Sequence, residues 1–305
     1  MSTSGTVFNQ VLILFIIMAI GFIIKKRGIM NSTVNKKLSE LLLKVTAPLL
    51  VISSFQVEFT PEILVNVLMV FAFAVAAHIV SILLGQVLFK RSNVEEKKIM
   101  KFAAIYSNCA FMGFPLLESL FGSTGVLYGS IYVAAFNIFV WTNGVAIFSE
   151  RKKFDLKSLK KILLNPGIVS VVIGILLFVF SLELPAPAAR AINLVGSMTV
   201  PLSMLIIGAT IADCEIKKLL SGWNLYYITA VRLVLMPVLA FVALKLVGMP
   251  DMLLKVCTVV VAMPVATTTA IFAELHDSNA IFASRVVALS TLLSIVTIPL
   301  LMLII

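Results

Sequence analysis

The sequence is poor in charged side chains and in the residues that usually carry chemistry. Of its 305 residues only 12% are charged, and it contains two histidines and three cysteines. An ordinary soluble domain carries about 25% charged residues, so this composition excludes that class. The three cysteines, Cys109, Cys214 and Cys257, show no C-x-x-C or metal-ligand spacing. We therefore predict neither a disulfide nor a metal site.

The motifs of membrane-embedded enzymes are also missing from the sequence. It contains no H-E-x-x-H and no G-x-x-x-x-G-K-[ST], and its four aspartates fall in loops or near the ends of apolar runs. Those motifs supply the metal or phosphate chemistry of known enzyme classes. We therefore expect that the protein is not an enzyme and uses no cofactor.

Hydrophobic residues dominate what is present. They make up 61% of the chain, and the mean hydropathy is +1.12. A helix needs about 20 apolar residues to cross a bilayer. Ten runs meet this measure: 7–24, 38–55, 62–89, 99–121, 125–148, 162–181, 189–211, 219–247, 252–274 and 279–304. The sequence therefore predicts an all-α polytopic membrane protein with ten transmembrane helices.

The basic residues behind the net charge of +10 are concentrated in alternate loops. Four alternate loops hold 18 of the 24 Lys and Arg residues, whereas the loops around Glu58, Glu118 and Glu183 hold almost none. This pattern follows the positive-inside rule and places both termini outside the cytoplasm, so it does not indicate a nucleic-acid partner. The first apolar run is followed by Lys25-Lys26-Arg27 and has no basic residue before it. We interpret it as a transmembrane helix and not as a cleaved signal.

A polar central loop, residues 149–161, divides the chain into two sets of five spans, 1–148 and 162–305. Because five is odd, the second set must enter the membrane with inverted topology. Three landmarks recur at offsets of 149 to 156 residues: Thr46–Leu49 with Thr199–Leu202, Asn9 with Asn165, and Pro115 with Pro264. These ordered matches predict a 5+5 inverted repeat.

Two prolines, Pro115 and Pro264, interrupt spans four and nine beside polar residues. Proline lacks an N–H and clashes with the carbonyl four residues back, so we expect both helices to break and to free carbonyls near Phe111 and Val260. Paired broken helices are typical of a transporter's substrate site. The N-termini of the second half-helices would then face the midplane from opposite sides and suit an anion, while the freed carbonyls could hold a cation.

Several short stretches form a recognisable set. They are Asn108 to Leu117, which reads N-x-x-x-M-G-x-P-L-L, Asn165-Pro166-Gly167-Ile168, Pro201-Leu202 with Gly208, Ala262-Met263-Pro264, and Thr297-Ile298-Pro299-Leu300. At these residues the chain resembles the auxin efflux carrier family over essentially its whole length. The short central loop is typical of the bacterial members.

The resemblance implies a fold shared with the bile acid sodium symporters. Spans one, two, six and seven would form a scaffold that is often dimeric, so the resemblance implies a homodimer through these helices. Spans three to five and eight to ten would form a transport domain, with spans four and nine crossing at its centre. The family moves small organic anions, including auxin-like and dicarboxylic acids, by an elevator-type displacement.

The residues around the two breaks are the predicted substrate site. They are Asn108, Gly113, Pro115, Pro264, Thr267, Thr268, Thr269 and, with weaker support, Asn137 in span five. The Asn108 amide could donate to a substrate carboxylate or form a hydrogen bond between helices. The three threonines could contact the ligand or cap backbone groups that the break frees.

Two ionisable residues inside the spans are candidates for coupling or charge balance. His78 in span three could relay protons or be a neutral histidine paired within the bundle. Arg232 in span eight could pair with a carboxylate or balance an anionic substrate. Glu40 and Lys44, spaced i,i+4 near a predicted cytoplasmic end, are interpreted as a structural ion pair.

Together these features predict a secondary or facilitative transporter of small organic anions such as malate or malonate, in a bacterial inner membrane. An anion channel or a membrane-embedded ligand sensor is the alternative. The coupling ion, if the protein uses one, would be H⁺ or Na⁺. The absence of an ATP-binding motif indicates that a gradient, or downhill flux, drives transport.

Overall fold

The computed structural model describes residues 3–90, 92–148, 160, 163–212, 222–276 and 278–305. The predicted central linker, 149–161, therefore lies outside the described residues except for residue 160, and so does Cys214. The regular secondary structure of the described part is helical, apart from one isolated β-bridge. The α-helices are α1 (Thr3–Lys26), α2 (Ser32–Leu41), α3 (Ala47–Ser54), α4 (Pro61–Leu88), α5 (Val94–Ile105), α6 (Gly113–Phe139), α7 (Val145–Phe148), α9 (Pro166–Val179), α10 (Ala186–Ser197), α11 (Thr199–Ala212), α12 (Trp223–Ala230), α13 (Met236–Leu246), α14 (Asp251–Ala262), α15 (Thr268–Leu275) and α16 (Ala280–Met302), and three short π-helices are η1 (Leu42–Thr46), η2 (Val140–Gly144) and η3 (Val231–Leu235).

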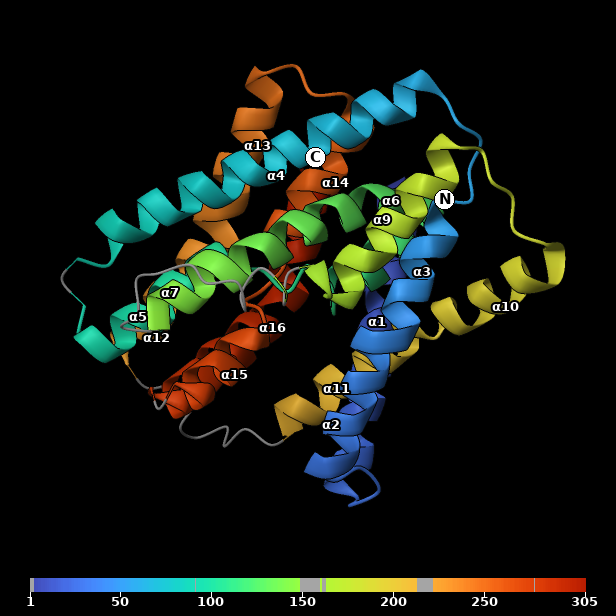
Figure 1. Cartoon of the computed structure of the whole chain (residues 1–305). Helices are drawn as coiled ribbons and strands as arrows, with labels where there is room; N and C mark the ends of the chain where they lie inside the picture. The colour runs from blue at the N-terminus through green and yellow to red at the C-terminus, as the bar shows by residue number, and fades with distance from the viewer. Residues whose placement is uncertain (1–2, 91, 149–159, 161–162, 213–221, 277) are drawn as a thin grey trace.

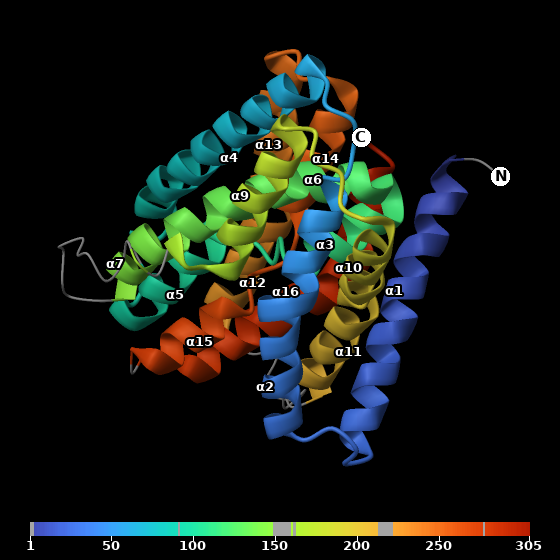
Figure 2. The same cartoon turned by 45° about the vertical axis from the view of Figure 1, so that its right-hand side comes forward.

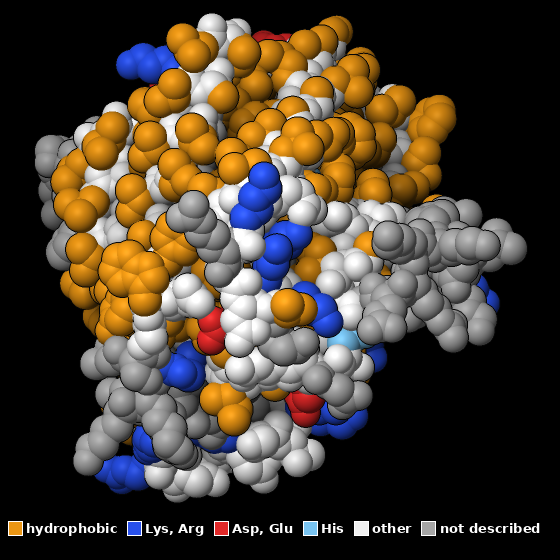
Figure 3. Space-filling view, turned by 90° about the vertical axis from the view of Figure 1, so that its left-hand side faces the viewer, with side chains coloured by type: hydrophobic (Ala, Val, Ile, Leu, Met, Phe, Trp, Pro, Cys, Tyr) orange, Lys and Arg blue, Asp and Glu red, His pale blue; other side chains and the backbone are white. Residues whose placement is uncertain are grey.

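Five helical stretches of the described chain are long and apolar enough to cross a membrane. They are Pro61–Leu88, Gly113–Phe148, Ala186–Ala212, Trp223–Leu246 and Ala280–Met302, and Pro166–Val179 is a shorter apolar helix. Figure 3 shows hydrophobic side chains over the upper part of one face and Lys and Arg side chains gathered below them. This segregation is the surface that a bilayer requires, with apolar side chains facing lipid and cations facing water.

The helices form two groups. In one group α1 packs along α11, and α3 packs against both α9 and α10. In the other group α4 packs against α5 and α6, α13 against α14, and α15 against α16. Figure 1 and Figure 2 show α4, α5, α12, α13 and α15 on one side and α1, α2, α10 and α11 on the other. Helix α6 contacts members of both groups and lies between them.

Two of the π-helices have a local cause in the sequence. Pro48 follows η1 and Pro237 follows η3, each inside an otherwise continuous helix. Proline cannot donate to the carbonyl four residues back and its ring clashes with that carbonyl. A wider π-turn relieves the clash, and π-turns are a recognised accommodation inside helices. In η3 the widened turn is closed by a bond from the Met236 N–H to the Val231 carbonyl.

Two helices are interrupted at corresponding places in the two halves of the chain. Residues 106–112 separate α5 from α6, and residues 263–267 separate α14 from α15. The two interruptions lie side by side, because Ser107 and Val265 form an antiparallel bridge. Helix α6 also contains a sharp bend at Gly122, whose φ of 60° only glycine adopts readily. The stretch before this bend is therefore a short half-helix that follows the first interruption.

Glycines allow α1 and α11 to approach closely. A Cβ added at Gly208 of α11 would collide with the backbone at Met18 and Phe22 of α1, and one at Gly21 would collide with the backbone of Leu205. Small residues at a helix contact let the backbones approach, which is a common device of transmembrane helix pairs. Helix α1 therefore depends on glycine for its place in the fold.

We expect Gly208→Ala to destabilise the purified protein in detergent by about 1–3 kcal/mol, because the added methyl group must displace the backbone of α1. The measurement is the thermal melting temperature. The matched control is Gly85→Ala in α4, where the nearest atom to the added methyl is the Cγ of Lys101 at 3.7 Å. Equal melting temperatures for the two variants would contradict the proposed close packing.

Candidate functional site

The two interruptions are joined by backbone hydrogen bonds. The Asn108 N–H donates to the Pro264 carbonyl at 2.8 Å, and the Ala266 N–H donates to the Tyr106 carbonyl at 3.0 Å. The Ser107 hydroxyl donates to the Val260 carbonyl at 2.9 Å, so the carbonyl expected to be free near Val260 has a partner. These bonds satisfy backbone groups that neither helix can satisfy itself, which the interior of a membrane demands.

The first break lies earlier in the chain than the proline rule predicted. The carbonyls expected near Phe111 are not the end of the first half-helix, because α5 already ends at Ile105. Pro115 instead lies in the first turn of α6, which begins at Gly113. A proline is well tolerated there because the first N–H groups of a helix have no partner within it. Pro115 thus starts the second half-helix and does not end the first.

Arg232 is the largest fully buried side chain among the described residues, with 1% of its surface exposed. Its Nη1 donates to the Ala104 carbonyl at 2.8 Å and its Nε donates to the Met263 carbonyl at 3.1 Å. Its Nη2 donates to the carbonyl of Val261. The alternative in which Arg232 pairs with a carboxylate finds no support among the described residues, because these hydrogen bonds all go to backbone carbonyls where α5 and α14 end. A guanidinium has the fork of donors that such a cluster of acceptors needs.

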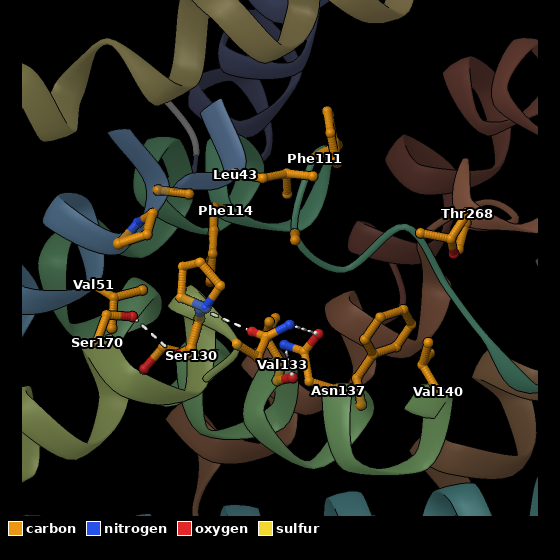
Figure 4. Close-up of a pocket in the computed structure, with 18 of the residues that line it drawn as sticks. Leu43, Val51, Phe111, Phe114, Ser130, Val133, Asn137, Val140, Ser170 and Thr268 are labelled. Atoms are coloured by element: carbon orange, nitrogen blue, oxygen red, sulfur yellow. Dashed lines mark hydrogen bonds between the residues drawn. The ribbon is translucent and has the colours of Figure 1, made fainter. Parts of the chain in front are cut away.

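A cavity of about 290 Å³ lies beside the two interruptions (Figure 4). One wall comes from η1, α3 and α9, and the other comes from the two interruptions, α6, η2 and α15. Most of the lining is apolar, and Figure 4 shows Phe111, Phe114, Val133 and Val140 around it. The polar groups are few, as in most small-molecule sites, where they fix the orientation of the ligand.

Unpartnered hydrogen-bond donors converge on this cavity. Asn108 is 3% exposed, and its Nδ2 has no partner among the described residues. The N–H groups of Thr267 and Thr268, at the start of α15, also lack an acceptor there, and so does the Thr268 hydroxyl. All three residues line the cavity. Because buried donors are normally paired, this set indicates a ligand that accepts hydrogen bonds.

Other polar groups on the cavity wall already have partners. Asn137 donates to the Val133 carbonyl at 2.9 Å and accepts from Asn165 at 3.3 Å. Asn165 in turn caps α9, accepting from the Gly167 N–H at 2.9 Å. Asn137 therefore lines the cavity but holds the start of α9, and both ends of its amide are occupied. Its predicted role in binding stays a prediction that this pairing weakens.

The remaining predicted residues take supporting positions. Gly113, Pro115, Pro264 and Thr269 are buried but are not part of the cavity wall. A Cβ at Gly113 would lie 3.6 Å from Val260, so this glycine packs α6 against α14. Pro264 presents its carbonyl to the paired segment, and the Thr269 hydroxyl has no partner among the described residues and is not part of the cavity wall. The structure thus brings Asn108, Asn137, Thr267 and Thr268 together at the cavity and places the other four outside its wall.

His78 lies in a cluster of aromatic rings away from the cavity wall. Its ring stacks on Phe139 with centroids 4.9 Å apart and lies 5.3 Å from the ring of Tyr132 and 6.1 Å from that of Tyr106. Its Nδ1 contacts the Ala74 carbonyl at 2.7 Å, and its buried Nε2 has no partner among the described residues. A link to the site runs through Tyr106, whose carbonyl belongs to the paired interruptions.

Lys44 is the charged residue of the cavity wall, although its spacing from Glu40 predicted a structural ion pair. It lies in η1, is exposed, and forms no hydrogen bond or salt bridge among the described residues. Glu40, its expected ion-pair partner, instead pairs with Lys37 at 3.3 Å and interacts with Lys44 only at longer range. The sequence did contain a signal that Lys44 belongs to a functional site. This lysine lies inside an apolar span, one turn before Pro48, and charges within spans usually mark function.

Known proteins that resemble this chain in sequence are transporters. A protein of Rhizobium meliloti (strain 1021) named "Putative malonate transporter" is 26% identical over 217 residues, 68% of this chain and 67% of that protein. An uncharacterized transporter of Methanocaldococcus jannaschii is 24% identical and one of Methanothermobacter thermautotrophicus is 21% identical, each over 96% of both chains.

The model of one family, described as membrane transport protein, matches residues 6–302. This match covers nearly the whole chain and confirms the resemblance to the auxin efflux carriers. Together with the several apolar helices, it identifies a multi-pass membrane protein. The chain belongs to the membrane transport protein family, that of the auxin efflux carriers.

Proposed function

We propose that the protein is a secondary or facilitative transporter of small organic anions, with the cavity beside the paired interruptions as its substrate site. The observation that carries this proposal is the convergence of unpartnered donors from Asn108, Thr267 and Thr268 on one largely apolar cavity. The N–H groups in this set can be satisfied only by acceptors, the Thr268 hydroxyl can also donate, and a carboxylate accepts several hydrogen bonds at once.

Electrostatics support an anion over a neutral acceptor. The start of α15 carries the positive end of a helix dipole, roughly half an elementary charge, toward the same cavity. Lys44 adds a full positive charge from η1. No Asp or Glu lines the described cavity wall. The site therefore favours negative charge from two sides.

The two centres of positive charge indicate a dicarboxylate. The donors at Asn108 and Thr268 would hold one carboxylate, and Lys44, which belongs to a different element of the same cavity, would receive the other. The malonate named for the Rhizobium meliloti relative is a short dicarboxylate of this kind. We propose malonate-like dicarboxylates as the substrate class.

The position of the cavity supports alternating access. It lies between the group of helices that contains η1, α3 and α9 and the group that contains α5, α14 and α15. If the second group slides against the first, one set of walls moves with the ligand while the other stays, which is an elevator-type exchange. We propose that these groups are the scaffold and the transport domain of a ten-span, 5+5 inverted repeat in which spans four and nine cross.

The proposed placement is a bacterial inner membrane with both termini outside the cytoplasm. The start of α1 and the end of α16 lie toward the same end of the molecule (Figure 1 and Figure 2), as an even number of spans requires. The scaffold helices would form a homodimer. An anion channel or a ligand sensor is the alternative, and a transport assay separates these functions.

The assay uses purified protein in liposomes and labelled malonate. A carrier is expected to show saturable uptake and counterflow, in which internal unlabelled malonate accelerates entry of the label. Currents near diffusion rates without counterflow would establish a channel instead. Tight binding without any flux would establish a sensor.

We expect Asn108→Ala and Thr268→Ala each to weaken malonate binding roughly 10- to 100-fold, because each removes a donor to a charged group, worth about 1.5–3 kcal/mol. The measurement is the half-saturation concentration of uptake, or Kd by calorimetry. The control is Asn193→Ala, an exposed asparagine of α10 that donates to Ser53 at 3.1 Å, outside the cavity. Wild-type affinity in both cavity variants would show that the site lies elsewhere.

We expect Lys44→Met to weaken binding of malonate by up to about fivefold, the effect of a partly solvated charge, while acetate binding changes less. The ratio of the two affinities is the readout, because loss of one carboxylate contact reduces preference for the second carboxylate. Lys36→Met, at an exposed position of α2 outside the cavity wall, is the control. An unchanged ratio would remove Lys44 from substrate recognition.

Proton coupling through His78 is a separate hypothesis, motivated by its buried and unpartnered Nε2. The groups around it are Tyr106 and Tyr132 as ring neighbours and Arg232 as the nearby charge. If His78 carries the proton, His78→Gln should flatten the dependence of malonate uptake on external pH. A variant that keeps both its activity and the wild-type pH profile would exclude this role.

A further inference from the structure

Arg232 occupies a position that is built for a cation. Two helix C-termini, those of α5 and α14, converge on it, and each carries the negative end of a helix dipole, roughly half an elementary charge. The sum is close to one negative charge, which balances one guanidinium. This balance explains how Arg232 stays buried with no carboxylate among its described contacts.

The acceptors around Arg232 are of the kind that bind a metal cation in other carriers. In transporters with broken helices, unwound backbone carbonyls and half-helix C-termini coordinate the coupling ion. Here the carbonyls of Ala104, Val261 and Met263 fit that description, and all three are taken by the guanidinium. Two further carbonyls beside the guanidinium's acceptors also have partners, since Val260 accepts from Ser107 and Pro264 accepts from Asn108.

We propose that Arg232 is a tethered counter-cation that fills the coupling-ion position of the paired interruptions, so that the protein works without Na⁺. The inference rests on the proposed transport function, and it adds that Na⁺ is not the coupling ion. Because the cation is covalently attached, it stays with the interruptions in every state. The substrate's charge is then the charge that crosses the membrane, unless a proton accompanies it.

The structure also explains why an arginine and not a lysine stands here. Three carbonyls from two different helices need donors that point in three directions from a flat group, and Nε, Nη1 and Nη2 each serve one of them. A lysine ammonium is a compact point charge on a flexible stem and would reach fewer of these carbonyls at once. Arg232 is thus a positioning residue, which holds the ends of α5 and α14 together behind the donors of the cavity.

The first test uses the wild-type protein. Its melting temperature in detergent and its uptake of labelled malonate are measured in NaCl and in matched choline chloride. We expect no difference between the two salts in either quantity. A rise of the melting temperature with Na⁺, or uptake that requires Na⁺, would overturn the proposal. If malonate is not taken up at all, the transport proposal fails, and the melting temperature still tests the cation position.

The second test removes the guanidinium group of Arg232 from between the ends of α5 and α14. We expect Arg232→Ala to lower the melting temperature and to reduce malonate uptake about tenfold or more, because hydrogen bonds to a charged group are lost. Millimolar guanidinium chloride, far below denaturing concentration, should restore part of both quantities, whereas equal concentrations of choline chloride should not. A side chain with only a packing role would give no rescue by guanidinium, and that result would overturn the proposal.

Two further variants complete the design. Arg190→Ala, at an exposed position of α10, should show wild-type melting and no response to guanidinium. Arg232→Lys keeps the charge but loses the fork of donors, so we expect intermediate melting and uptake and a weaker response to guanidinium. If Arg232→Ala does not fold, Arg232→Lys takes its place, and an Arg232→Lys protein identical to wild type in all three readouts would contradict the fork geometry.

Discussion

The requirement that backbone groups be paired at membrane depth shapes the centre of this protein. Where α5 and α14 stop, the lipid phase offers no water, so protein must supply every partner. Arg232 meets this need for three carbonyls at once, and its own charge is balanced by the two helix ends that it joins. Neither the buried cation nor the broken helices would be stable alone. Each therefore makes the other possible, and the cavity depends on both.

This arrangement separates acceptors from donors. Several carbonyls at the interruptions accept hydrogen bonds from Arg232, Ser107 and the facing backbone, while the donors of Asn108, Thr267 and Thr268 remain open toward the cavity. A site whose open groups are mainly donors favours a ligand that accepts hydrogen bonds, as an anion does, apart from any attraction between net charges. The apolar wall around it then limits the size of what can enter, and only a few polar groups set the orientation of the ligand.

The sequence predicted the helical membrane fold and the two interruptions, because each has a strong local signal. It also named Asn108, Thr267 and Thr268 among its candidate binding residues, and their role in binding stays a prediction. Apolar runs mark helices, and proline beside Asn or Thr marks a break that needs polar partners. The boundary at Ile105 was missed because proline fixes where a helix can begin as well as where it must end. The partners of Arg232 lie 29, 31 and 128 residues away, and the place of Lys44 depends on contacts with distant segments, which no local pattern encodes. The i,i+4 rule gave Lys44 the wrong partner, because η1 interrupts α-helical spacing there.

The π-turns have a consequence for how the chain tolerates changes in length. A π-turn holds one residue more than the α-helical turn that it replaces, so removing one residue from Val231–Leu235 would return the segment to α-helix while the flanking helices keep nearly the same register. Arg232 lies inside this segment, and Lys44 lies inside the corresponding segment before Pro48. A single-residue deletion within either π-helix would therefore change the direction in which its cation points while the helices on both sides stay in register. Such a deletion would act here on the aim of one charge and leave the rest of the bundle in place.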